Sequence, residues 1–166
     1  KIGLDSGAAP EKWNLEKPEK IKKVHTNYIE AGADLIETNT FGGNLVRLKE
    51  SELGNSLEVI NKKAVAIARS AATADTIIAG SVGPTGKMIE PLGELSPQAA
   101  QDSYYQQISV LVENKVDVIL IETMVDLPEI EAGVKAASEF DIPVIAQMNF
   151  GESGNTVMGY SLQDLV

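Results

Sequence analysis

The fold is decided by residues 28–40, which read YIEAGADLIETNT. Before this stretch, Pro18 suits a first helical turn, and apolar side chains recur at helical spacing at positions 21, 24, 28 and 29. Gly32 is a suitable C-terminal stop for that helix. Residues 33–38 follow as a short apolar run with the length of a buried parallel strand. The sequence therefore predicts a helix over about 18–31 that leads directly into a strand.

The same alternation continues along the chain. Ser96 before Pro97 is a helix cap, and Asp126 with Glu129 resembles a capping box. Ser161 with Asp164 repeats that capping pattern two residues before the chain stops, while residues 1–14 are expected to be loop. Further helices are expected from about 55 to 71, from 97 and from 126 to 138, and further strands at 76–81, 116–122 and 142–148.

Alternating strands and helices predict an α/β fold with a parallel sheet and right-handed crossovers. A closed barrel and an open doubly wound sheet both satisfy this pattern. The GxGxxG turn that would favour an open dinucleotide-binding sheet is absent from the sequence. Long loops follow the strands at 39–54 and 82–95, and in a barrel these strand ends carry the chemistry.

Composition narrows the possible functions. The chain has 166 residues, of which 43% are hydrophobic and 23% charged, as in an ordinary globular domain. Its net charge of −10 disfavours binding to nucleic acid or to anionic membranes. There are no cysteines and one histidine, so a disulfide framework, a thiolate zinc site and a cysteine nucleophile are excluded within these residues.

The sequence Leu-Ile-Glu-Thr occurs twice, and each copy closes a predicted strand. Glu37 and Glu122 therefore lie at the C-terminal ends of parallel strands, where an acid is costly to bury without a partner. One interpretation is structural, with each carboxylate bonded to a helix start or an arginine. The other is that at least one of them holds a substrate ammonium or accepts a proton.

Two loops could contribute further ligand groups. Residues 80–86 read GSVGPTG, and glycines at a strand end let backbone N–H groups approach an anion closely. Asn39 begins the loop before Gly42 and Gly43, and its amide could bond a carboxylate or an amine. Gly-Pro turns and Asx turns are the structural alternatives for the two loops. Gln147 and Asn149, at the end of the last strand, could lie at the same end of the barrel.

Three other residues are expected to be structural. Lys87 lies in a glycine-rich loop where a solvated amine is a poor Schiff-base nucleophile, although an aldolase-type barrel remains a third reading. His25 is expected to be a partly exposed packing residue, and Trp13 an anchor for the beginning of the chain.

Taken in order, these segments resemble the homocysteine S-methyltransferase domain family. The similarity is carried by residues 13–15, by 28–44 with the string ETNTFGGN, by GSVGPTGK at 80–87, by EPLG at 90–93 and by IETM at 121–124. Within the family the chain most resembles the homocysteine-binding module of cobalamin-dependent methionine synthase. The long ETNTFGGN string is specific, whereas the Gly-Pro loop alone is less so.

The resemblance implies a (β/α)8 TIM barrel that transfers a methyl group to the thiol of homocysteine, giving methionine. It implies that a zinc ion held by three cysteine thiolates activates the thiol, and that methylcobalamin and methyltetrahydrofolate, carried by other modules, are the methyl source. S-methylmethionine or another methylated donor is the alternative. Glu122 is expected to hold the substrate ammonium. The other substrate-binding candidates are Ser81, Gly83, Asn39, Thr123 and Glu37.

The family's first strand and its cysteine motifs have no counterpart here, so residues 1–166 are expected to form an incomplete homocysteine-binding barrel of about strands 2 to 5. No catalytic residue and no metal ligand are then expected within them. We expect these residues alone to be inactive and to need the rest of the barrel, or another methionine synthase module, as partner. A cytoplasmic location follows only from the reduced thiols that the family's chemistry needs. The alternative function is a non-catalytic amino-acid-binding or assembly protein derived from the barrel.

Overall fold

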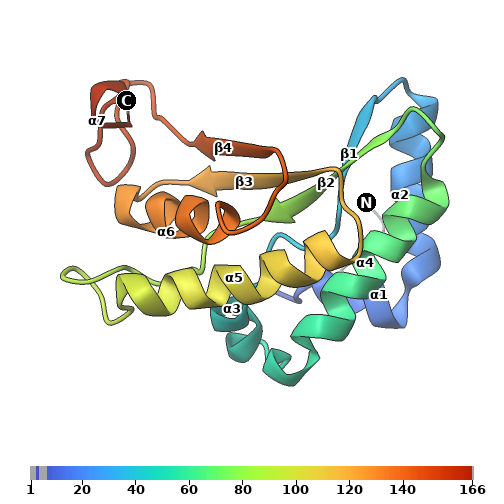
Figure 1. The fold of residues 1–166 in the computed structure, drawn as a ribbon, viewed down its shortest axis with the longest axis horizontal. Coiled ribbons are helices and arrows are strands. Elements are labelled where there is room, and N and C mark those ends of the chain that lie inside the picture. Colours follow the sequence, from blue (N-terminus) through green and yellow to red (C-terminus); the bar gives the residue numbers. More distant parts are fainter. Residues whose placement is uncertain (1–2, 4–6, 166) are drawn as a thin grey trace.

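Four parallel strands form one sheet in the order β1-β2-β3-β4 in the computed structural model, which describes residue 3 and residues 7–165 (Figure 1). The strands are β1 (Leu35–Glu37), β2 (Ile77–Val82), β3 (Val118–Met124) and β4 (Val144–Met148). Each lies within two residues of its predicted position. Chain order equals sheet order, as expected when a helix crosses over between successive parallel strands.

The connecting segments are helical and agree with most of the predicted positions. They are η1 (Pro10–Lys12), α1 (Trp13–Glu16), α2 (Pro18–Glu30), α3 (Leu45–Glu50), η2 (Gly54–Ser56), α4 (Leu57–Ala71), α5 (Pro97–Glu113), α6 (Leu127–Ala137) and α7 (Leu162–Leu165). The Ser96 side chain caps α5 by accepting a hydrogen bond from the Ala99 N–H. Over residue 3 and residues 7–165, no helix is long and apolar enough to cross a membrane.

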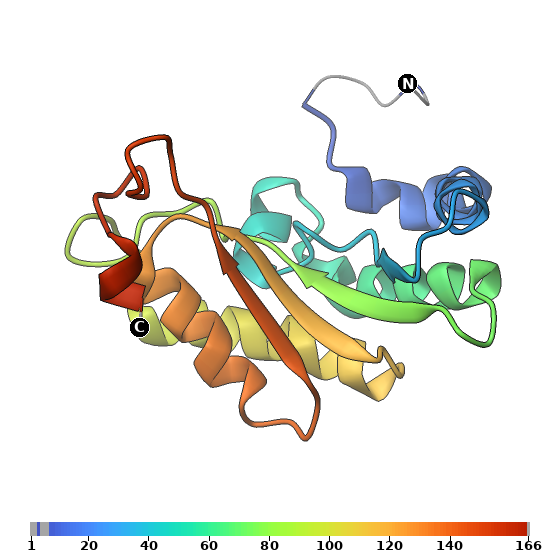
Figure 2. The same ribbon diagram turned by 90° about the horizontal axis from the view of Figure 1, so that it is seen from above.

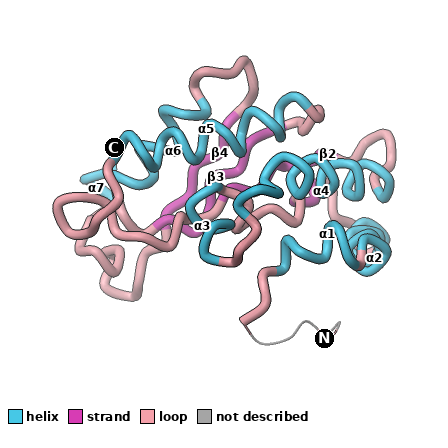
Figure 3. Tube along the Cα trace, turned by 90° about the horizontal axis from the view of Figure 1, so that it is seen from below, coloured by secondary structure: helices cyan, strands magenta, loops and turns pink. Residues whose placement is uncertain are grey.

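The helices α4, α5 and α6 cover one face of the sheet, as the view from below shows (Figure 3). Alternate strand residues point to this face, and Ile78, Ile119 and Ile121 are fully buried against Tyr104 and Ile108 of α5. This layer is the main hydrophobic core. It leaves the other alternating set of strand residues, which includes both glutamates, on the opposite face of the sheet.

The sheet is open, and the chain has the form of part of a barrel. Each of β1 and β4 pairs with one neighbour only within the described residues. Val144 and Ile145 of β4 are 38% and 43% exposed, which is unusual for a strand of a parallel sheet. Seen from above, α1 and α2 lie beside the β1 edge, away from the layer of α5 and α6 (Figure 2). The predicted α/β fold with a partial barrel is confirmed.

Three local expectations were wrong. Part of the expected loop over residues 1–14 is helical in η1 and α1, while residues 1–2 and 4–6 lie outside the described residues. The loop at 39–54 contains α3, because Asn44 accepts a hydrogen bond from the Arg47 N–H and so caps a short helix. Asp126 makes no side-chain cap for α6, and the Glu129 side chain binds Thr85 in the loop after β2.

Candidate functional site

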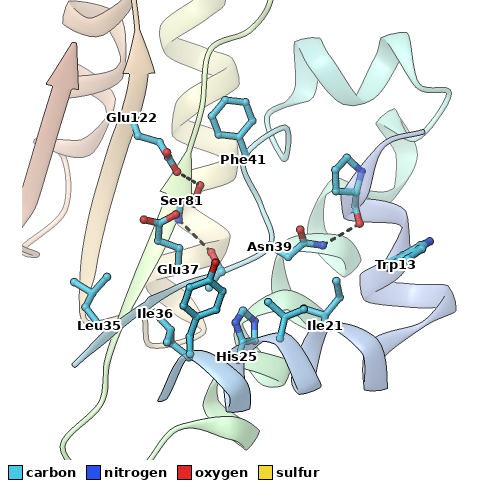
Figure 4. Close-up of a pocket in the computed structure, with 14 residues that line it drawn as sticks. Trp13, Ile21, His25, Leu35, Ile36, Glu37, Asn39, Phe41, Ser81 and Glu122 are labelled. Atoms are coloured by element: carbon cyan, nitrogen blue, oxygen red, sulfur yellow. Dashed lines mark hydrogen bonds between the residues drawn. The ribbon is translucent and has the colours of Figure 1, made fainter. Parts of the chain in front are cut away.

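A cavity of about 610 Å³ lies between α2 and the ends of β1, β2 and β3 (Figure 4). Its polar side contains the two glutamates together with Ser81 and Asn39. Its apolar side comes mainly from α2, β1 and the loop after β1. The lining residues are Pro10, Trp13, Ile21, Val24, His25, Tyr28, Leu35, Ile36, Glu37, Thr38, Asn39, Phe41, Ser81 and Glu122.

Glu37, Ser81 and Glu122 come together from three neighbouring strands. The Ser81 hydroxyl donates a 2.6 Å hydrogen bond to Oε1 of Glu122, and Figure 4 shows Glu37 beside them. The side chain of Glu37 lies in the same cavity as that of Glu122 (Figure 4). The sequence-based prediction placed these acids at one rim of the sheet, and the geometry brings them into one cavity.

The electrostatics of Glu37 differ from those of an ordinary surface glutamate. Partial loss of water raises the pKa of Glu37, and the charge of Glu122 and the contact with its carboxyl raise that pKa further. Glu37 nevertheless remains exposed at the mouth of the cavity. A positively charged group entering the cavity would therefore meet two acids that repel each other when both are ionised.

Ser81 is held in place by a buried set of hydrogen bonds. Its N–H donates to Thr38 Oγ1 at 3.1 Å, and its carbonyl accepts from Thr40 Oγ1 at 2.7 Å. Gln107 of α5 donates to the carbonyls of both Thr40 and Ser81. Gln107 was not predicted as part of the site, and the available signal was an amide at the helical spacing of the apolar residues Tyr104 and Leu111.

Thr123 follows Glu122 in a backbone conformation that is unusual for a β-branched residue. Its φ is 62°, and the pairing of β3 with β4 is irregular between Ile121 and Met124. Thr123 Oγ1 lies 3.4 Å from Glu122 Oε2. Thr123 is not among the cavity-lining residues, and it adjoins the site as the chain neighbour of Glu122 and through this hydroxyl contact.

Replacing Thr123 by glycine should give a more stable protein than replacing it by alanine. Both changes remove the same hydroxyl and methyl groups, but only glycine adopts a φ of 62° without steric cost. We expect the Gly variant to have a free energy of unfolding about 1 kcal/mol higher than the Ala variant. Denaturant unfolding measures the difference, and an Ala variant as stable as the Gly variant would show that the backbone is relaxed there.

Asn39 is fixed by the beginning of the chain. Its Nδ2 donates to the Pro10 carbonyl and to Asn14 Oδ1, both at 2.9 Å, and its carbonyl accepts from Asn14 Nδ2 at 2.8 Å. The donors of the amide are thus used within the protein, and Oδ1 is the side-chain group it presents. Trp13, expected to be an anchor, is 5% exposed and packs with Ile21.

His25 is buried rather than partly exposed, so that expectation was wrong. It is 6% exposed, lines the cavity, and its buried Nε2 has no hydrogen-bond partner among the described residues. Burial lowers the pKa of His25, so the imidazole is neutral near pH 7. The sequence places Ile21, His25 and Tyr28 on one face of a helix, but it does not show what that face packs against.

The glycine-rich loop uses its backbone donors within the protein. The Gly83 N–H donates to the Phe41 carbonyl, and the Thr85 N–H donates to Glu129 Oε1. Gly83 does not line the cavity, and a Cβ there would lie 2.6 Å from the Phe41 ring, which explains the need for glycine. The loop packs closely on the segment that carries Asn39 and Phe41.

The remaining candidates lie away from the cavity. The Lys87 side chain is 53% exposed and pairs with Glu50, which raises the pKa of Lys87 and disfavours Schiff-base chemistry. Gln147 and Asn149 are exposed on the open side of β4 and do not line the cavity. Apart from Ser81, the glycine-rich loop therefore contributes no lining group, and neither do Lys87 and the last strand.

The sequence analysis did not predict that Glu129 is buried. Glu129 is 4% exposed, and its Oε1 accepts hydrogen bonds from the Thr85 N–H at 2.8 Å, Thr85 Oγ1 at 2.5 Å and Tyr104 Oη at 3.0 Å. Burial first, and the Glu129 carboxylate second, raises the pKa of Tyr104. This cluster joins α5, α6 and the loop after β2, beside the strand that carries Ser81.

The donor set does not fit zinc. The sequence contains no cysteine, and the described part of the chain has no group of three or more His, Cys, Asp or Glu residues that could hold a metal ion. Zinc prefers thiolate and imidazole ligands, and the cavity offers two carboxylates and one buried imidazole. No chemical step can therefore be assigned to a metal held by these residues.

Comparisons of the sequence and of the fold with known proteins agree on one family. Residues 5–166 match the sequence model described as homocysteine S-methyltransferase. Methionine synthases of Mycobacterium tuberculosis (strain ATCC 25618 / H37Rv) and Mycobacterium leprae (strain TN) are 31% and 29% identical over 158 residues, or 88% of this chain. The chain spans only 13% of the length of either protein.

The fold also has a counterpart among solved structures. The oxidized form of the homocysteine methyltransferase MmuM from Escherichia coli superposes with a TM-score of 0.85 at 23% sequence identity. The superposition covers 98% of this chain and 62% of MmuM. At that level of identity, the comparison shows the fold.

Proposed function

Because this chain belongs to the homocysteine S-methyltransferase family, we propose that its cavity binds the amino-acid end of homocysteine for methyl transfer to the thiol. The observation that carries the proposal is the convergence of Glu37, Ser81, Glu122 and Asn39 on one cavity at the ends of parallel strands. Acid groups that converge at this edge of a parallel sheet suit a cationic ligand group.

Each part of the cavity has a role in this proposal. Glu122 accepts hydrogen bonds from the substrate ammonium, and Ser81 positions the Glu122 carboxylate through the 2.6 Å bond to its Oε1. Asn39 Oδ1 offers a second acceptor at the rim. Leu35 and Phe41 pack against the methylene groups of the ligand and exclude water from one side.

We propose that residues 1–166 form part of a homocysteine-binding (β/α) barrel whose remaining strands come from elsewhere in the native protein or from a partner chain. The open sheet edges at β1 and β4 support this, as do the exposed apolar side chains of β4. A zinc ion that activates the thiol would then have its ligands outside these residues. The methyl donor, methylcobalamin or methyltetrahydrofolate, would be presented by other modules.

A methyl-transfer assay on the complete native polypeptide tests the proposal. We expect methionine to form from L-homocysteine and a methylated donor, and the coding sequence after residue 166 to supply cysteine ligands. The second candidate, a non-catalytic amino-acid-binding protein, is favoured by the absence of cysteine here. It predicts a stop codon after residue 166 and homocysteine binding without methionine formation, which would contradict the enzyme. Reduced-thiol chemistry leads us to propose a cytoplasmic location.

A further inference from the structure

Two carboxyl groups lie on the same side of the cavity. Glu37 closes β1 and Glu122 lies near the end of β3, with Ser81 of β2 between them (Figure 4). Both side chains line the cavity, and Ser81 donates to Oε1 of Glu122. Two carboxylates close together need a proton or a cation between them, because two negative oxygens repel each other at short distance.

The cavity contains no positive side chain that could supply this charge. Among the described residues that line it, none is lysine or arginine. The titratable groups that α2 presents to the cavity are His25, which is neutral near pH 7, and the Tyr28 phenol. From β2 and from the loop after β1, the polar side chains are Ser81, Thr38 and Asn39, none of which titrates. The compensating charge must therefore come from solution.

We propose that Glu37 and Glu122 share one proton in the empty cavity, and that the ammonium group of a bound amino acid takes the place of that proton. This inference rests on the proposed function and extends it. It makes Glu37 a second carboxyl of the ammonium site, and it makes binding release a proton to the solvent. The cavity then changes from one bound proton to one bound ammonium, so its net charge is the same in both states.

The raised pKa of Glu37 determines the pH range over which ligand affinity changes and the direction of that change. The empty cavity holds the proton above the pH of about 4.3 at which a free glutamate loses it, so the affected range is mildly acidic. Within this range the ammonium competes with the proton, and affinity rises with pH by up to about tenfold per pH unit. Above the range the pair is already deprotonated, and affinity no longer depends on pH.

The proton held by the pair also makes the stability of the fold depend on pH. The folded protein binds more protons than the unfolded chain between the ordinary pKa of a glutamate and the raised pKa of Glu37. The stability contributed by this group is therefore present at low pH and is lost as pH rises through the folded pKa.

The first experiment needs no ligand. Carbon-13 NMR of the side-chain carboxyls in the complete native polypeptide should show Glu37 and Glu122 titrating together in two steps, with the upper step above the range of the exposed control Glu131. The Glu37→Gln variant should lack the upper step. Independent titration of the two carboxyls in the range of Glu131 would overturn the shared proton.

The second experiment measures proton release on binding. L-2-aminobutanoate is the probe, because it has the amino-acid end of homocysteine but no thiol that could release a proton of its own. Calorimetry in buffers of different ionisation enthalpy should show net proton release on binding at mildly acidic pH, and the release should fall to none as the pH is raised to about 8. In Glu37→Gln the release and the pH dependence should disappear, whereas Glu131→Gln should keep both.

The outcomes separate the two proposals. Binding of L-2-aminobutanoate without proton release at any pH would overturn the displacement and leave the proposed function standing. Failure of both L-2-aminobutanoate and L-homocysteine to bind would overturn the ammonium site itself, while the ligand-free titration would still decide whether the proton is shared.

Discussion

Replacing Glu129 with alanine should lower the free energy of unfolding by about 4 kcal/mol. The change leaves the Thr85 N–H, the Thr85 hydroxyl and the Tyr104 hydroxyl without their acceptor, in a place where water has little access. Each buried donor without a partner costs about 1–3 kcal/mol. Denaturant unfolding measures the loss.

Two matched variants give this prediction its controls. Glu131→Ala removes a glutamate from the same helix, but Glu131 is exposed and pairs with Lys135 at 3.3 Å, so the cost should stay below about 1 kcal/mol. Tyr104→Phe removes one of the three donors and should cost about 1 kcal/mol. If Glu129→Ala were as mild as Glu131→Ala, the buried acid would not hold the loop after β2.

Glu122→Gln in the complete native polypeptide should weaken the binding of L-homocysteine by about 10- to 100-fold. The change removes the negative charge that we propose holds the substrate ammonium, while the side chain keeps nearly the same shape. An amide oxygen can still accept from Ser81, so the fold should be retained. Calorimetric titration at neutral pH gives the affinities.

Glu131→Gln is the control for this second prediction, because it removes an equal charge from an exposed site on α6. Its affinity for homocysteine should equal that of the wild type. An unchanged affinity in Glu122→Gln would place the substrate ammonium elsewhere.

Most of the fold could be predicted from local patterns. The helix that begins at 97 follows from Ser96, Pro97 and the spacing of its apolar residues. The strand predicted at 116–122 follows from a short apolar run, and β3 occupies Val118–Met124. The helical turns at 10–16 were missed because contacts with distant segments, such as Asn14 with Asn39, stabilise them. The short α3 had a local signal in its Asn44 cap, which the sequence analysis did not use.

The candidate site was predictable only in part. Glu37 and Glu122 could be brought together because both close parallel strands, whose ends meet at one edge of a sheet. The contacts of Glu129 with Thr85 could not be predicted, because the two residues are 44 positions apart and Glu129 also fits a local capping pattern. The burial of His25 depends on how α2 lies against the cavity, which no local pattern specifies.

A double-mutant cycle between Glu122 and the ligand's amino group tests the central claim most directly. The affinities of wild type and Glu122→Gln are measured for L-homocysteine and for 4-sulfanylbutanoate, which lacks the amino group. We predict that Glu122→Gln weakens homocysteine about 10- to 100-fold and leaves the affinity for 4-sulfanylbutanoate nearly unchanged. Equal losses for both ligands would show that Glu122 does not bind the ammonium, and would contradict the proposed site.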